Sequence, residues 1–230
     1  MTNFHKVVVT AVQWFLKIYL GSGIYKFWSS IHRFLFDGKW KNVELPKYDS
    51  MDDVVRKIET FKWKQDGATE LFDAICTPQK VQAVGFDKTS PHGNDCDEEA
   101  IWNSNVISNS IPFKDPVNFW HTGLQRADFF TVTWFEVKDP GTTFWSKLYS
   151  YFFGISFSGH NVCLLTYDNG YRYLDYSFPS NVYKTVDEVA QLVINTYAGW
   201  DSTGHGTKKG ERLVYCVADK DLNVQFTKIG

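Results

Sequence analysis

The chain has 230 residues, enough to bury one sizeable hydrophobic core, so we expect a single main domain with additions. Its formal net charge of −2 excludes a protein that binds nucleic acid through an overall positive charge. Cys76, Cys96, Cys163 and Cys216 are scattered without a CxxC pair, which favours a reducing compartment, with two long-range disulfides as the alternative. We therefore expect a cytoplasmic protein.

Residues 1–47 form a basic and aromatic segment, in which seven basic residues accompany two acidic ones. Four polar residues share one stripe of a predicted amphipathic helix: Lys6, Thr10, Gln13 and Lys17. Gly21-Ser22-Gly23 separates this helix from a second one over 24–36. No window reaches the roughly 18 uninterrupted apolar residues that a membrane span requires.

The N-terminal helices allow three interpretations. The first is an accessory helical pair that packs on the main domain. The second is peripheral membrane association, because Trp, Phe and Lys on one helix suit the headgroup boundary. The third is a surface that contacts a protein partner. Phe27-Trp28-Ser29 resembles Phe144-Trp145-Ser146, which indicates a second aromatic helix downstream.

The stretch 50–110 has the start and stop signals of several helices. Ser50 with Asp53 predicts one helix start, and Thr77-Pro78 predicts another helix that ends at Gly85. A turn or helix is expected over 71–75. A longer helix is predicted to begin at Cys96.

The second half of the chain has mainly strand patterns. The predicted strands are 129–137, 160–167, 171–176, 213–218 and 223–229, with one helix at 185–197. Asp168-Asn169-Gly170 is a strong hairpin signal between two of these strands. Helices first and antiparallel strands afterwards predict an α+β fold.

Cys96 is the first candidate for chemistry. A thiol at a helix N-terminus gains thiolate character from the positive end of the helix dipole. The acidic residues around it, Asp95 and 97–99, oppose thiolate formation and also suit the first turn of a helix. The alternative is that Cys96 is a small buried apolar residue.

His160 and Asp175 are the candidates for a base and the residue that orients it. A two-residue Asn169-Gly170 loop would place Asp175 opposite Leu164, on the same face of the hairpin as His160. The two side chains would still be four residues apart along the ladder, on the order of 13 Å. A bulge, a strong twist or a different turn register must close that distance.

The run Asp95-Cys96-Asp97-Glu98-Glu99-Ala100, followed by His160-Asn161-Val162 and Leu174-Asp175, resembles the transglutaminase-like superfamily, particularly its bacterial cysteine-proteinase branch. The resemblance implies a papain/transglutaminase-like core, in which a helix bearing the nucleophile packs on an antiparallel sheet. The similarity covers roughly residues 60–180. Together with the basic, aromatic composition of the N-terminal segment, it predicts a helical extension, 1–48, and a catalytic domain, 49–230.

The resemblance implies a papain-like catalytic triad, with Cys96 as nucleophile, His160 as base and acid, and Asp175 as the orienting carboxylate. The expected activity is that of a cysteine protease or amidase that hydrolyses peptide or side-chain amide bonds through a thioacyl intermediate, with transfer to an amine left open. Candidates for the oxyanion donor are the Cys96 backbone N–H, Gln65 and Trp63. We expect a protein or peptide substrate, no cofactor, no metal and no nucleic acid.

Two other functions compete with this interpretation. A zinc site could use His92 and Cys96, four residues apart, although zinc ligands usually come in tighter pairs. A catalytically silent transglutaminase-like module could bind a partner or a membrane surface through its aromatic segments. The reactivity of the Cys96 thiol separates the enzyme from the silent module.

Overall fold

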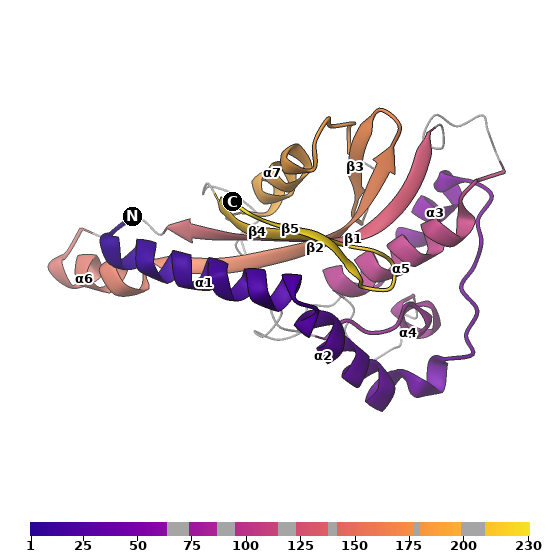
Figure 1. Cartoon of the computed structure of the whole chain (residues 1–230), viewed down its shortest axis with the longest axis horizontal. Coiled ribbons are helices and arrows are strands. Elements are labelled where there is room, and N and C mark those ends of the chain that lie inside the picture. Colours follow the sequence, from indigo (N-terminus) through magenta and orange to yellow (C-terminus); the bar gives the residue numbers. More distant parts are fainter. Residues whose placement is uncertain (64–73, 87–94, 115–122, 138–141, 177–179, 199–209) are drawn as a thin grey trace.

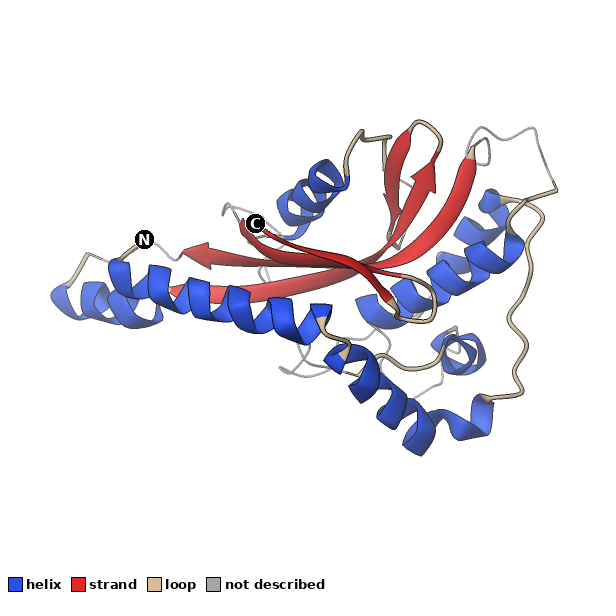
Figure 2. Ribbon diagram, viewed as in Figure 1, coloured by secondary structure: helices blue, strands red, loops and turns tan. Residues whose placement is uncertain are grey.

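The computed structural model describes the chain except for residues 64–73, 87–94, 115–122, 138–141, 177–179 and 199–209. Within the described residues, a five-stranded antiparallel sheet carries helices on both faces (Figures 1 and 2). This arrangement confirms the predicted α+β class.

The strand order across the sheet is β3-β2-β1-β4-β5. The strands are β1 (Leu124–Val137), β2 (Ile155–Tyr167), β3 (Gly170–Leu174), β4 (Glu211–Ala218) and β5 (Val224–Ile229). β1 and β2 pair along most of their length, whereas β3 covers only residues 163–167 of β2. The outer edge of β2 therefore has no strand partner over 155–162 among the described residues.

The helices occupy the N-terminal half and the connections between strands. They are α1 (Asn3–Gly21), α2 (Ile24–His32), η1 (Arg33–Asp37), η2 (Gly38–Trp40), α3 (Met51–Ile58), α4 (Pro78–Lys80), η4 (Val81–Gly85), α5 (Cys96–Ser110), α6 (Phe144–Phe153) and α7 (Val186–Tyr197). The predicted break at residues 21–23 separates α1 from α2.

Local capping explains why the main helices begin where they do. Asp95 and Glu98 form a capping box at α5, and Thr185 and Glu188 form one at α7. At α3, the Ser50 side chain accepts a hydrogen bond from the Asp53 N–H. All three starts agree with the sequence prediction, because caps depend on residues close together in the chain.

Three apolar clusters hold these layers together. Helices α3 and α5 pack on one face of the sheet around Trp102 and Phe129. Helix α7 packs on the opposite face around Val132 and Val193. Helix α1 packs against β4 and β5 through Leu16. The layers leave the N-terminus of α5 next to the exposed edge of β2.

Two predicted strands begin earlier in the structure, and one further predicted element is largely untested. β1 begins at Leu124 and β2 at Ile155, five residues before their predicted starts, because apolar cross-strand pairs extend both strands. The predicted turn or helix over 71–75 lies largely outside the described residues, and 74–77 are not helical.

No described helix is by itself long and apolar enough to cross a membrane. Asn3–Gly21 and Ile24–Trp40 pass that test only as a pair, and the pair is bent by 59°.

Candidate active site

Cys96 is the first residue of α5, directly after the N-cap Asp95. The Asp95 side chain accepts from the Asp97 N–H at 3.2 Å, and Glu98 accepts from the Asp95 N–H at 3.1 Å. The acidic residues therefore do stabilise the helix start, as one interpretation expected. The Cys96 side chain itself is half-buried. All four cysteines are free thiols.

The surroundings of Cys96 favour the protonated thiol. Burial raises its pKa well above the ordinary value, and the nearby carboxylates of Asp95 and Asp97 raise it further. Hydrogen bonding from Asn161 acts in the opposite direction. The helix dipole does not compensate for these effects, so ionisation of the sulfur requires a base.

Asn161 of β2 is the side chain in contact with the sulfur. Its Nδ2 donates to the Cys96 Sγ at 3.8 Å. Its Oδ1 accepts from the Thr131 hydroxyl at 2.7 Å, and Thr131 is the partner of Asn161 in the ladder between β1 and β2. Thr131 therefore fixes the amide so that its N–H₂ group faces the thiol.

His160 and Asp175 are brought together as predicted. The His160 Nε2 lies 3.0 Å from the Asp175 Oδ2, and both side chains are buried. The Tyr197 hydroxyl of α7 donates to the same carboxylate oxygen. The Tyr197 ring also lies against the imidazole, with 3.9 Å between ring centroids. The carboxylate and the tyrosine together fix the orientation of His160.

The hairpin register explains how His160 and Asp175 meet. Tyr167 pairs with Gly170, so the tight turn is Asp168-Asn169 and not the expected Asn169-Gly170. Leu174 then pairs with Cys163, which brings Asp175 two residues closer to His160 than the predicted register does. A different turn register closes the distance, one of the three solutions considered from the sequence.

His160 and Asn161 point to opposite sides of β2. The His160 ring contacts Tyr197 of α7, whereas the Asn161 amide contacts Cys96 of α5. Successive side chains of a strand alternate between faces, which accounts for this difference. Consequently no hydrogen bond joins Cys96 to His160, although Cys96 contacts the next residue of the same strand.

Glu99 and Tyr176 lie near both the Cys96–Asn161 pair and the His160–Asp175 pair. Glu99 is 1% exposed, and its Oε1 accepts from the Tyr176 N–H at 2.8 Å and from the Asn103 amide at 3.0 Å. Burial raises the pKa of Glu99 well above its usual range, and Asp175 adds to the effect. Tyr176 has a φ of 40°, a left-handed conformation that a tyrosine rarely adopts. Glu99 thus holds the backbone turn directly after Asp175.

The helical extension contributes one residue to these surroundings. Burial raises the pKa of Tyr25 in α2 well above its usual value, and charges on Asp97 and Cys96 raise it further. Its ring lies 6.5 Å from that of Phe129 in β1. The extension is therefore packed close to the start of α5.

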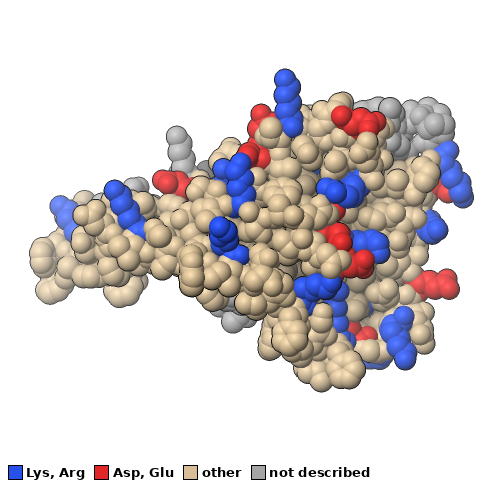
Figure 3. Space-filling view, in the orientation of Figure 1, with Lys and Arg blue, Asp and Glu red and all other residues tan. Residues whose placement is uncertain are grey.

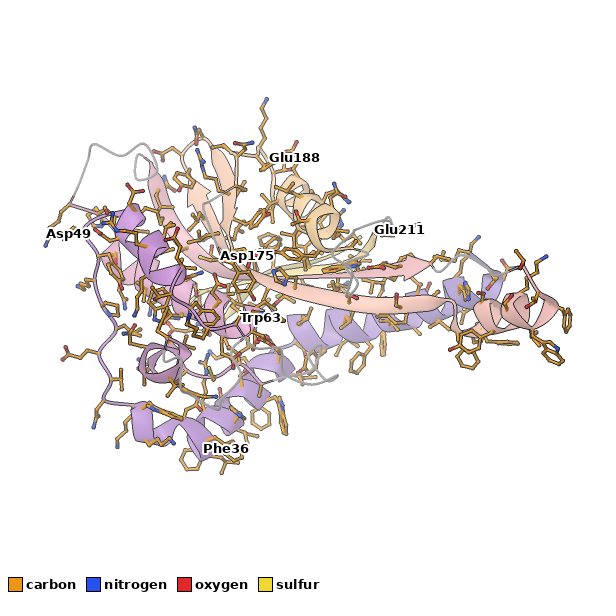
Figure 4. All side chains as sticks on the ribbon, turned by 180° about the vertical axis from the view of Figure 1, so that it is seen from behind. Phe36, Asp49, Trp63, Asp175, Glu188 and Glu211 are labelled. Atoms are coloured by element: carbon orange, nitrogen blue, oxygen red, sulfur yellow. The ribbon has the colours of Figure 1, made fainter. Side chains whose placement is uncertain are left out.

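The structure gives little information on the other predicted site residues, Gln65, Trp63 and His92. Gln65 and His92 lie outside the described residues, so neither the oxyanion role of the first nor the zinc role of the second is tested. Trp63 is 54% exposed. Asp175 and Trp63 are labelled in Figure 4, which shows the molecule turned by 180° from Figure 1.

One acidic group in the described residues has its ligand atoms within 4.8 Å of one another: Asp95, Asp97 and Glu98. Two of these residues form the capping box of α5, and this explains the cluster without a metal.

Comparison with known proteins does not assign a family. A scan against protein-family models finds no match, and a search of curated proteins finds no significant relative.

Asn161 was not among the functional residues predicted from the sequence. The only signal available was its position between His160 and Val162 in the motif. Its contact with Cys96 depends on how α5 packs on β2, and this packing is a tertiary property.

Proposed function

We propose that the protein is a thiol-dependent acyl-transfer enzyme that hydrolyses peptide or side-chain amide bonds through a thioacyl intermediate on Cys96. One observation carries the proposal: the half-buried Cys96 at the start of α5 contacts Asn161, and the next residue, His160, is hydrogen-bonded to Asp175. A nucleophile, a base, its orienting carboxylate and an amide donor thus come from three elements to one edge of the sheet. The resemblance of the motifs to transglutaminase-like proteinases, with their papain-like core, supports the same proposal.

The first step transfers the thiol proton to His160. Because Nε2 faces Asp175, the other ring nitrogen, Nδ1, accepts the proton. The sulfur attacks the carbonyl carbon as it loses the proton. The Cys96 backbone N–H and the Asn161 Nδ2 donate to the oxyanion. The imidazolium then protonates the leaving amine and a thioacyl-enzyme remains. Water, deprotonated by His160, releases the acid and restores the thiol.

The mechanism requires one movement. In the structure the imidazole is hydrogen-bonded to Asp175 and lies against Tyr197, so it must leave both contacts and turn around the edge of β2 to reach the sulfur. At residue 160 this edge has no strand partner among the described residues. General-base assistance at the moment of attack agrees with the raised pKa of the thiol.

The test combines turnover of a fluorescent protein substrate with iodoacetamide labelling of Cys96, read by mass spectrometry. We expect Cys96→Ala to lose hydrolysis completely and to retain its circular dichroism spectrum. We expect His160→Ala to lower turnover by about 10²–10⁴-fold and to slow labelling of Cys96 near neutral pH. The control is Cys216→Ala, which removes a buried thiol on β4 and should retain activity.

Hydrolysis that survives in Cys96→Ala would refute the proposal. Labelling that is the same in wild type and His160→Ala at every pH would remove His160 as the base. In that case the silent binding module becomes the better interpretation, because the raised pKa of an unassisted thiol makes it inert.

A further inference from the structure

Helix α6 is exposed although it is apolar. Its N-terminus is capped by Thr143, but none of its ten residues is buried. Phe144 and Trp145 are 71% and 74% exposed. Isolated helices of this length are marginal in water, and exposed apolar patches of this kind mark interaction sites. Phe4 of α1 contacts part of this helix, and most of its apolar surface remains exposed.

Helix α1 has two apolar stripes on opposite sides. One stripe, which includes Val9, Leu16 and Leu20, is buried against the sheet. The other stripe is exposed and has helical spacing: Phe4, Val7, Trp14 and Ile18. A helix that packs on one domain needs a single apolar stripe, so the second stripe requires a second apolar environment.

The exposed apolar surface continues along α2 and η1. Its large exposed side chains there are Ile24, Phe27, Trp28, Phe34, Leu35 and Phe36. Phe4 of α1 contacts Tyr151 and Phe152 of α6, which joins the other end of the surface. Figure 4 shows Phe36 at the tip of the helical extension, far from Asp175. The exposed apolar residues of α1, α2, η1 and α6 are called the aromatic face below.

Among the described residues, the exposed charges on the helices of the aromatic face are positive. Lys6, Lys17 and Lys147 are exposed on α1 and α6, and these two helices contain no acidic residue. In α2, η1 and η2 the single acid is Asp37, which is buried and accepts from the Thr77 N–H. Figure 3 shows scattered lysines over α1 on a largely uncharged surface. Exposed aromatic rings and lysines without acids are complementary to anionic headgroups.

We propose that the aromatic face binds the surface of an anionic lipid bilayer and lies in its interface. Trp and Tyr rings suit the headgroup level, and the lysine stems reach from the apolar boundary to the lipid phosphates. A second copy bound through the same face would bring two surfaces of the same positive sign together across a two-fold axis. Protein interface cores are depleted in lysine. The packing of α1 on β4 and β5 and its 59° bend to α2 exclude a straight span in this structure.

The proposal does not depend on the chemistry of Cys96. A membrane-bound enzyme and a membrane-bound silent module would both use the aromatic face, so its test is separate from that of the proposed function.

The experiment is flotation of the 230-residue chain with vesicles of phosphatidylcholine alone or with roughly one-third phosphatidylserine. We expect wild type and Cys96→Ala to float equally with the anionic vesicles. The double variant Phe144→Ser and Trp145→Ser should bind about tenfold or more weakly, because two large rings no longer enter the lipid. Phe226→Ser is the control, since this ring contacts Tyr215 on the α7 side of the sheet.

Single lysine variants test the contribution of positive charge to vesicle binding. Lys17→Gln and Lys147→Gln should each weaken binding to anionic vesicles about fivefold, whereas Lys184→Gln near α7 should not. Folded wild type that fails to float with either vesicle, or a double variant that floats like wild type, overturns the proposal. A wild-type dimer that becomes a monomer in the double variant, without vesicle binding, assigns the face to a second copy.

Discussion

Helix α5 is rich in polar residues but buried, whereas helix α6 is apolar but exposed. α5 buries twelve of its fifteen residues, including Glu99, Asn103 and Ser104. α6 buries none of its ten, although it contains six aromatic rings. Polar groups are normally outside and large apolar groups inside, so both helices depart from the usual distribution. Buried polar groups in α5 indicate a candidate catalytic site, and exposed apolar groups in α6 indicate a candidate binding surface.

In α5 the buried polar groups are mostly paired. Ser104 donates to the Ile101 carbonyl, and Asn105 donates to the carbonyls of Ile101 and Lys220. The exceptions lie next to the candidate site, where Glu99 Oε2 and Asn103 Oδ1 have no hydrogen-bond partner among the described residues. Buried polar groups without partners cost free energy, which folded proteins tolerate mainly at functional sites. In α6 the unfavourable free energy comes from apolar surface exposed to water.

The largest effect in this comparison concerns stability. Trp102 of α5 is fully buried, contacts Phe86 and donates to Gln82. Trp102→Ala should lower the free energy of unfolding by about 3–5 kcal/mol, because it leaves a cavity in the core. Trp145→Ala in α6 should change it by less than about 0.5 kcal/mol. Urea unfolding of both variants measures the difference, and equal losses would show that α6 is covered.

The next effect concerns the role of the half-buried Asn161 amide. Asn161→Ala should lower kcat by about 10²–10³-fold with KM little changed, because the amide acts on the oxyanion and not on the bound substrate. Thr131→Val, which removes the hydroxyl that orients the amide, should have a smaller effect. Steady-state kinetics on the same protein substrate decides. A loss confined to KM would assign Asn161 to substrate binding.

The smallest effect concerns the pH dependence of the thiol. The Asp97 carboxylate raises the pKa of Cys96, so Asp97→Asn should lower that pKa. Alkylation follows the thiolate fraction, which grows as pH rises through the pKa. The labelling curve should therefore move to lower pH, and labelling at pH 8 should be several-fold faster. Glu59→Gln, at the end of α3, is the control. An unchanged curve would mean that Asp97 carries no charge near the sulfur.

The sequence by itself determined the elements that depend on short-range interactions. The capping residues Ser50 and Thr185 predicted the starts of α3 and α7, because a cap satisfies N–H groups within the next turn. The start of α5 at Cys96 was also predicted, whereas its cap Asp95 was not. Gly21-Ser22-Gly23 predicted the break after α1. The pairing of His160 with Asp175 was also predicted, from the motif and the shared face of one hairpin.

The exact turn register was not predictable from the hairpin alone. The Tyr183 backbone pairs with Tyr171, and a Cβ on Gly170 would lie 2.2 Å from the Tyr183 carbonyl oxygen. The segment at Tyr183, which follows the hairpin, thus passes against the turn and helps to select the register that places Asp175. Two-residue loops one step apart have similar local propensities, so only this packing separates them.

Only the tertiary structure decided which faces are covered. Strand periodicity places His160 and Asn161 on opposite sides of β2, but the choice of side requires knowing that α7 packs on one face and α5 on the other. Likewise, composition left open whether the apolar residues of α1 and α6 pack on the main domain or face a membrane or a partner. Burial is a property of the neighbours that a side chain meets, and those neighbours come from segments far apart in the chain.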